Sequence, residues 1–249
     1  LAGEDVRTGT VALRQGRCLT PSDLGLLASL GIAEMEVMRR LRVAFFSTGD
    51  ELRSLGESLD VGCVYDSNRY TLHAMIERAN FTPLDLGVVR DDPASLEDAL
   101  RDACKQADVI ITTGGVSAGD ADHTRAMMAR LGEVLFWKIA MRPGRPMAFG
   151  QIRVDGKTAL LFGLPGNPVA VMATFYFFAR DALFRLQGTS ADQPPIIRAI
   201  TEQTIAKRPG RTEFQRGVLS FDASGNARVR LTGDRKSTRL NSSHVSESR

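Results

Sequence analysis

Short apolar runs and longer stretches of helical periodicity alternate along residues 41–187. This alternation is typical of βαβ units, in which each helix carries the chain back to the start of a neighbouring parallel strand. It predicts an α/β fold with a parallel-rich sheet and helices on both faces. The predicted strands are residues 43–47, 84–89, 108–113 and 133–140, and the predicted helices between them are residues 67–80, 93–106 and 122–130.

A hairpin and a long helix are predicted after the last of these strands. Two alternating runs, residues 147–152 and 157–162, flank the dipeptide Asp155-Gly156, which is typical of a tight β-turn. The helix is predicted over residues 168–186. Asn167 can cap its first turn, and Pro168 would then stand at a position where its missing N–H costs nothing.

A short helix is also predicted near the start of the chain. Ser22 or Asp23 can cap it through a side-chain oxygen. Its apolar positions run through Ala28 or Leu30, and Gly31 is a typical helix stop. The first residues show neither an initiator methionine nor a signal-peptide pattern, so we expect the chain to be a fragment that begins inside an upstream unit.

The segment after residue 188 has the pattern of a small β domain. Residues 196–206, 214–221 and 227–233 alternate in the manner of strands, with a turn at residues 224–226. We expect this domain to be truncated before its sheet can close. Residues 235–249 are rich in serine and nearly devoid of apolar side chains, which predicts a disordered tail, and the break in composition suggests a foreign sequence.

Composition places the chain among ordinary globular proteins, with 43% apolar and 24% charged residues. The three cysteines are isolated and show no CxxC spacing, so neither a zinc site nor a disulfide framework is expected, and the pattern favours a cytoplasmic location. The longest apolar stretch, residues 169–179, is well short of the roughly 20 residues that span a bilayer. We therefore expect no membrane span.

The net charge of +3 is unevenly distributed along the chain. Residues 189–249 carry 11 lysines and arginines against 6 aspartates and glutamates, whereas the remainder is slightly acidic. This basic segment lacks the interleaved aromatic side chains on which nucleic-acid bases stack. Nucleic acid is therefore not an expected partner.

Acidic residues follow three of the predicted strands. Glu51 follows the first strand, Asp91 the second, and Asp122 lies in the loop after the third. Ligands of an open parallel sheet bind beyond the carboxyl ends of its strands, so we expect these three carboxylates to converge within reach of one divalent cation such as Mg²⁺. Helix caps or solvated loop residues would explain the same pattern equally well.

A glycine-rich loop after residues 108–113 predicts a phosphate cradle. Gly114 and Gly115 allow close backbone approach, while the hydroxyls of Thr113 and Ser117 and the nearby backbone N–H groups can hold an anionic oxygen. The loop is neither a Walker A motif nor a dinucleotide-binding GxGxxG motif. The chain also shows no Ser/His/Asp arrangement, so nucleophilic acyl transfer is not expected.

Basic residues and a helix start supply two further candidate anion sites. Lys138, Arg142 and Arg145 surround a turn stiffened by prolines, an arrangement that suits oxyanions; a solvated basic turn is the alternative. The loop at residues 164–168 leads into a helix whose free N–H groups favour an anion, and a simple helix entry explains it equally well.

Six motifs together resemble the molybdopterin molybdenumtransferase family, whose eukaryotic relative is the C-terminal region of gephyrin. They are VAFFSTGDEL, VYDSNRYTLHAMI, LGVVRDDP, ADVIITTGGVSAGDADH, FWKIAMRPGRPMAFG and LFGLPGNPVAVMATFY, in the family's order and spacing. The resemblance covers about residues 1 to 234. It implies the end of a linker domain at 1–40, an α/β domain of the molybdopterin-binding type at 41–187 and a truncated β-barrel domain at 188–234.

The resemblance also implies an activity, the insertion of molybdate into adenylylated molybdopterin with Mg²⁺ and release of AMP. The full-length protein would be a homodimer that acts on these small-molecule substrates. The family's functional positions fall on Asp5, Glu51, Asp91, Asp122, Lys138, Arg142, Pro165 and Pro168. Residues expected to contact the molybdopterin substrate are Thr113, Gly114, Gly115, Ser117, Arg145, Pro165, Asn167 and Pro168.

Two departures from the family pattern stand out. The basic turn has arginines where the family often has lysines, so bidentate geometry replaces a point charge. The family's N-terminal region, which completes the site across a dimer, is missing, so we expect this chain by itself to be inactive. Two alternatives remain open at this point, a molybdopterin adenylyltransferase of the same fold and a gephyrin-like scaffold that binds a partner peptide.

Overall fold

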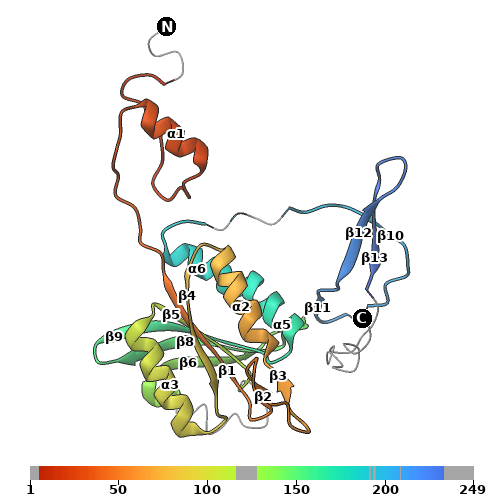
Figure 1. Ribbon diagram of the computed structural model, residues 1–249. Coiled ribbons are helices and arrows are strands. Elements are labelled where there is room, and N and C mark those ends of the chain that lie inside the picture. The colour runs from red at the N-terminus through yellow and green to blue at the C-terminus, as the bar shows by residue number, and fades with distance from the viewer. Residues whose placement is uncertain (1–5, 116–127, 191, 193–194, 208, 233–249) are drawn as a thin grey trace.

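The centre of the protein is a six-stranded sheet with the strand order β4-β1-β5-β9-β8-β6 (Figure 1). The computed structural model describes residues 6–115, 128–190, 192, 195–207 and 209–232. All of these strands run in one direction except β8, which is antiparallel to both β6 and β9. The strands are β1 (Arg42–Thr48), β4 (Thr82–Val89), β5 (Val109–Thr113), β6 (Gly132–Lys138), β8 (Pro146–Val154) and β9 (Lys157–Leu164).

Helices cover both faces of the sheet, as predicted (Figure 1). Successive residues of a strand point to opposite faces, and β1 accordingly sends Phe45 into one core and Phe46 into the other. The Phe45 core lies under α2 and the helices after β9, and the Phe46 core lies under α3. The helices are α2 (Ser67–Arg78), α3 (Pro93–Gln106), α5 (Pro168–Thr174) and α6 (Arg180–Leu186), with a π-helical stretch, η1 (Phe175–Ala179), between the last two.

The predicted elements of the central region are confirmed within two residues at each end, with two qualifications. Most of the helix expected at 122–130 lies outside the described residues. Residues 128–131, which are described, are helical. The long helix at 168–186 is interrupted by η1, which a continuous apolar pattern could not reveal. The hairpin turn is confirmed, since Asp155 and Gly156 both have positive φ, as a tight two-residue turn requires.

The first helix, α1 (Pro21–Ser29), is confirmed but its predicted cap is wrong. The N-cap is Thr20, and Asp23 is the third residue of the helix. The carboxylate of Asp23 accepts hydrogen bonds from the backbone N–H and the hydroxyl of Thr20, each at 2.8 Å. The side chain of Thr20 in turn faces the backbone N–H of Asp23, which completes a capping box, and Pro21 stands at the first helical position.

We expect the folding of α1 to depend on pH through Asp23. Hydrogen bonds from Arg17 and Thr20 lower the pKa of this carboxyl to about 2. Its stabilising effect is therefore complete above the ordinary aspartate pKa of about 3.9 and is lost as the pH falls through the lowered value. Amide hydrogen exchange over residues 21–29 should become faster between about pH 4 and pH 2 relative to the intrinsic rate. Equal protection at both pH values would contradict this, and Asp23→Asn should remove the pH dependence.

The C-terminal segment forms a separate small sheet with the order β10-β13-β12. Its strands are β10 (Ile200–Thr201), β12 (Gly217–Phe221) and β13 (Ala227–Leu231). The turn at 224–226 is confirmed, whereas only two residues of the predicted strand at 196–206 are extended in the sheet. The domain boundaries and the truncation stay predictions, and the tail lies outside the described residues. No helix in the described ranges has the length and apolarity to span a bilayer.

Candidate functional site at the carboxyl edge of the sheet

The carboxyl ends of five strands lie along one edge of the sheet. In the register of the sheet, Ser47 of β1 is opposite Thr113 of β5, and Thr113 is opposite Leu164 of β9. The strand β6 runs in the same direction, so its last residue, Lys138, lies on this edge too. The loops that carry the predicted site residues therefore all leave the sheet on one side, where ligands of open α/β sheets bind.

The loop after β5 packs tightly against the end of β1. The hydroxyl of Thr48 donates a hydrogen bond to the carbonyl oxygen of Thr113 at 3.3 Å. Gly114 follows with φ of 84°, and a Cβ atom there would overlap the carbonyl oxygen of Thr48 and lie 2.9 Å from its Oγ1. Only glycine fits this position, because it tolerates both the positive φ and the close approach.

Thr113 is placed differently from the expectation. Its side chain is buried, and its Oγ1 lies 2.9 Å from the hydroxyl oxygen of Ser47. The hydroxyl therefore ties β5 to β1, and in the described part of this loop it is the backbone of Gly114 and Gly115 that can face a ligand. Asp5, Ser117 and Asp122 lie outside the described residues.

The loops after β1 and β4 contact each other. The backbone N–H of Asp91 donates to Oδ1 of Asp50 at 3.4 Å. Glu51 is exposed, and its carboxylate folds back over Gly49. Asp92 caps α3 by accepting hydrogen bonds from the backbone N–H groups of the first turn, so the capping role belongs to Asp92 and not to Asp91.

These carboxylates can be compared with the needs of a Mg²⁺ ion. No group of three or more His, Cys, Asp or Glu side chains within the described ranges could hold a metal. Magnesium, however, usually binds one or two carboxylates and completes its shell with water and substrate phosphate oxygens. The neighbouring loops of Glu51 and Asp91 provide carboxylates of that kind, so the chemistry of the donors fits the ion.

The cationic turn, residues 138–146, connects β6 to β8. Its ends are closed by the backbone N–H of Ile139, which donates to the carbonyl of Arg145 at 2.7 Å. Lys138, Arg142 and Arg145 are all exposed. The underside of the turn packs on α5, since a Cβ on Gly144 would lie 2.5 Å from Met141 Cε and 2.8 Å from Thr174 Cγ2. Three cations are thus displayed from a turn with a fixed base.

The loop between β9 and α5 packs against the loop after β5. Pro165 is buried, and Gly166 lies in van der Waals reach of Gly114. Oδ1 of Asn167 accepts hydrogen bonds from the backbone N–H groups of Val169 and Ala170 at 3.0 and 3.3 Å, which confirms Asn167 as the cap. Because the cap already satisfies these N–H groups, Asn167 and Pro168 shape the loop, and the start of α5 offers fewer donors to an anion than expected.

Sequence reasoning missed a buried polar cluster at the start of α2. Asp66 caps this helix, and Arg69 forms ion pairs with Asp66 at 3.7 Å and with Asp85 at 3.5 Å. Asn68 donates from Nδ2 to the carbonyl of Gly166 at 2.8 Å and so fixes the β9–α5 loop. The available signal was the polar run DSNR, which supplies the N-cap and the first turn of a helix whose remaining turns are apolar on one side.

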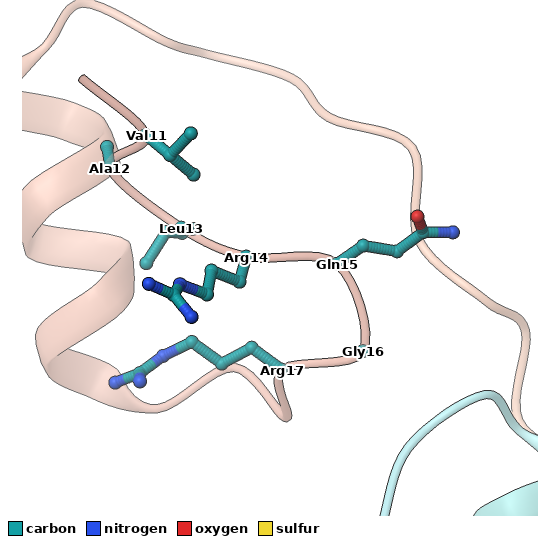
Figure 2. A pocket seen from close by; sticks show the side chains of 7 residues that line it. All are labelled: Val11, Ala12, Leu13, Arg14, Gln15, Gly16 and Arg17. Atoms are coloured by element: carbon teal, nitrogen blue, oxygen red, sulfur yellow. The ribbon is translucent and has the colours of Figure 1, made fainter.

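A hollow of about 460 Å³ lies away from this edge, in the N-terminal region (Figure 2). A single loop, Val11 to Arg17, lines it. Figure 2 shows the side chains of Arg14 and Arg17 lying toward α1, and Arg17 is paired there with Asp23 at 2.9 Å. One arginine is already paired with a carboxylate and the described lining comes from a single loop, so the hollow does not resemble a ligand site.

Comparison with known proteins places the sheet and its edge in a family. A family model described as a probable molybdopterin binding domain matches residues 44–185. A molybdopterin molybdenumtransferase of Haemophilus influenzae is 44% identical over 232 residues, which are 93% of this chain and 56% of the relative. The chain belongs to the molybdopterin molybdenumtransferase family. It spans about half the length of the curated relatives it matches.

Solved structures of this family share the fold. A molybdopterin biosynthesis moeA protein from Pyrococcus horikoshii OT3 superposes with a TM-score of 0.71 at 29% identity, over 91% of this chain and 53% of that one. A molybdenum cofactor biosynthesis protein from Pyrococcus furiosus gives 0.66 at 31% identity, over 91% of this chain and 69% of that one. The α/β class with a parallel-rich sheet is therefore confirmed for this family member.

Proposed function

We propose that the protein containing this chain inserts molybdate into adenylylated molybdopterin and releases AMP in molybdenum cofactor biosynthesis. The observation that supports it most is that the glycine loop at Gly114 and the exposed cationic turn leave the same edge of the sheet. The names of the family relatives supply the substrate class. The structure offers no observation that favours an adenylyltransferase or a peptide-binding scaffold.

The glycine loop and the cationic turn on this edge suit the two anionic substrates, adenylylated molybdopterin and molybdate. The backbone at Gly114 and Gly115 can approach a phosphate closely, because no Cβ intervenes and turned N–H groups bind anions. Lys138, Arg142 and Arg145 would bind the molybdate oxyanion, with the planar guanidinium groups offering paired donors to two of its oxygens. Asn68 holds the β9–α5 loop through the carbonyl of Gly166, beside the glycine loop.

Glu51 and Asp91 would hold Mg²⁺ against the substrate phosphates. When bound, the ion would neutralise phosphate charge and polarise the bond to AMP. Asp122 and Asp5 belong to the same proposed set by resemblance. A homodimeric full-length protein, a cytoplasmic location and the inactivity of this chain by itself likewise stay predictions.

The function is tested by measuring AMP release from adenylylated molybdopterin in the presence of molybdate, using the full-length protein. We expect Glu51→Gln to lower the rate at least about tenfold, because a lost metal contact at the reacting phosphate costs more than about 1.4 kcal/mol of transition-state stabilisation. The control is Glu77→Gln, an exposed carboxylate near the end of α2, which leads to the opposite edge of the sheet.

The outcome separates the alternatives. An unchanged rate and unchanged Mg²⁺ requirement in Glu51→Gln would contradict the assigned role. Formation of adenylylated molybdopterin from ATP, instead of its consumption, would identify an adenylyltransferase.

A further inference from the structure

A short strand from the C-terminal segment lies on the cationic turn. This strand, β11 (Thr212–Glu213), pairs in parallel with β7 (Met141–Arg142), the strand inside the turn. The backbone N–H of Thr212 donates to the carbonyl of Ala140, and that of Phe214 donates to the carbonyl of Arg142, each at 2.8 Å. Figure 1 shows β11 beside the end of α5, apart from the β10-β13-β12 sheet.

An aromatic contact anchors this strand to the long helix. The ring of Phe214 lies 4.1 Å, centroid to centroid, from the ring of Phe177, at an interplanar angle of 34°. Phe177 belongs to η1, where the helix winds more widely than an α-helix, and its side chain remains 48% exposed. Phe214 therefore covers an apolar side chain that the central domain leaves at its surface. This aromatic contact stabilises the position of β11 on the central domain.

A carboxylate on the strand faces one cation of the turn. Glu213 Oε1 lies 4.0 Å from Arg142 Nη1; the Glu213 side chain is 13% exposed and that of Arg142 is 59% exposed. A largely buried carboxylate beside a flexible, exposed guanidinium limits the orientations that the guanidinium can adopt. The turn is thus held on two sides, by α5 beneath Gly144 and by β11 along Arg142.

We propose that the brace, residues 212–214, positions the cationic turn for oxyanion binding, with Phe214 as its anchor and Glu213 orienting Arg142. This inference rests on the proposed function of the turn as an oxyanion site. Phe214 and Glu213 are positioning residues, because they act through Arg142 and need not touch the ligand. A preorganised turn binds more tightly, since less side-chain and loop ordering has to accompany binding.

The two possible effects of Glu213 have opposite signs. If Glu213 acted only as a negative charge near the site, its removal would tighten the binding of an anion. If it orients Arg142, its removal weakens binding despite the more favourable net charge. We expect Glu213→Gln to weaken molybdate binding, and tighter binding would overturn this part of the proposal.

The anchor is tested by titrating molybdate alone into the full-length protein and its variants by calorimetry. Phe214→Ala should raise the dissociation constant about tenfold while the unfolding temperature of the protein changes little. Phe214→Leu should restore most of the affinity. The matched control is Phe221→Ala, a 66% exposed phenylalanine of β12 in the same segment, which should bind molybdate normally. Phe177→Ala combined with Phe214→Ala should be no worse than either alone, because both changes break one contact.

Arg142→Ala distinguishes failure of the brace from failure of the oxyanion site. Normal molybdate affinity in Phe214→Ala, with affinity lost in Arg142→Ala, would overturn the brace and leave the proposed site in place. Normal affinity in Arg142→Ala would overturn the site itself, and the brace with it.

Discussion

Replacing Lys138 and Arg142 together with alanine is expected to weaken molybdate binding by about a hundredfold or more while leaving stability nearly unchanged. A hydrogen bond to a charged group contributes about 1.5–3 kcal/mol, and each 1.4 kcal/mol is about tenfold in affinity. Both side chains are exposed, and the carboxylate of Glu213, which pairs with Arg142, lies 4.0 Å from its guanidinium. Exposed charges of this kind contribute about 0–1 kcal/mol to folding.

Calorimetric titration with molybdate measures the affinity, and thermal unfolding measures the stability. The control is Lys105→Ala with Arg153→Ala, which removes the same two charges at the other end of the sheet, around the β8–β9 hairpin. The control should bind molybdate as the unmodified protein does. Loss of folding in the Lys138/Arg142 variant, with affinity unaffected under conditions where it folds, would make these residues structural.

Gly114→Ala is expected to destabilise the central domain by about 2 kcal/mol or more. A left-handed backbone conformation costs a residue with a Cβ about 1–2 kcal/mol, and relief of the overlap with the carbonyl of Thr48 adds to that cost. The added methyl group would push apart the ends of β1 and β5, so molybdopterin binding at this edge should fall as well.

Urea unfolding of Gly114→Ala and Gly166→Ala provides a matched comparison. Gly166 lies in the adjacent loop, has no positive φ, and a Cβ there would meet only Gly114 Cα at the ordinary distance of 3.7 Å. Gly166→Ala should therefore stay within about 0.5 kcal/mol of the unmodified protein. If the two variants were equally stable, the tight packing of the β5 loop on β1 would not be a constraint on this site.

The local features of the fold could be predicted because their signals lie within a few residues. Asn167 caps its helix, as predicted, through backbone N–H groups two and three residues away. The Asp155-Gly156 turn is likewise a local choice of φ. The cap of α1 was misassigned within the same short range, since Pro21 at the first helical position makes Thr20 the cap and moves Asp23 into the helix.

The direction of the strands predicted which loops lie on the same edge of the sheet. Alternation of strands and helices is enough to bring parallel strand ends to one edge, and this placed the loops of Glu51, Asp91 and Gly114 on the same side. The same reasoning could not show that β6 joins the edge through the antiparallel β8, which is what brings Lys138 and Arg142 to it.

By itself, the sequence determined the elements, their order, the α/β class and the residue types available at the strand ends. Only the tertiary structure decided that Thr113 is turned inward to Ser47, that Asn68 holds Gly166, and that residues 212–214 lie along the cationic turn. The physical reason is the range of the interactions. Periodicity and capping depend on neighbours within about one helical turn, whereas these contacts join residues 66 and more positions apart, whose meeting depends on how the whole sheet assembles.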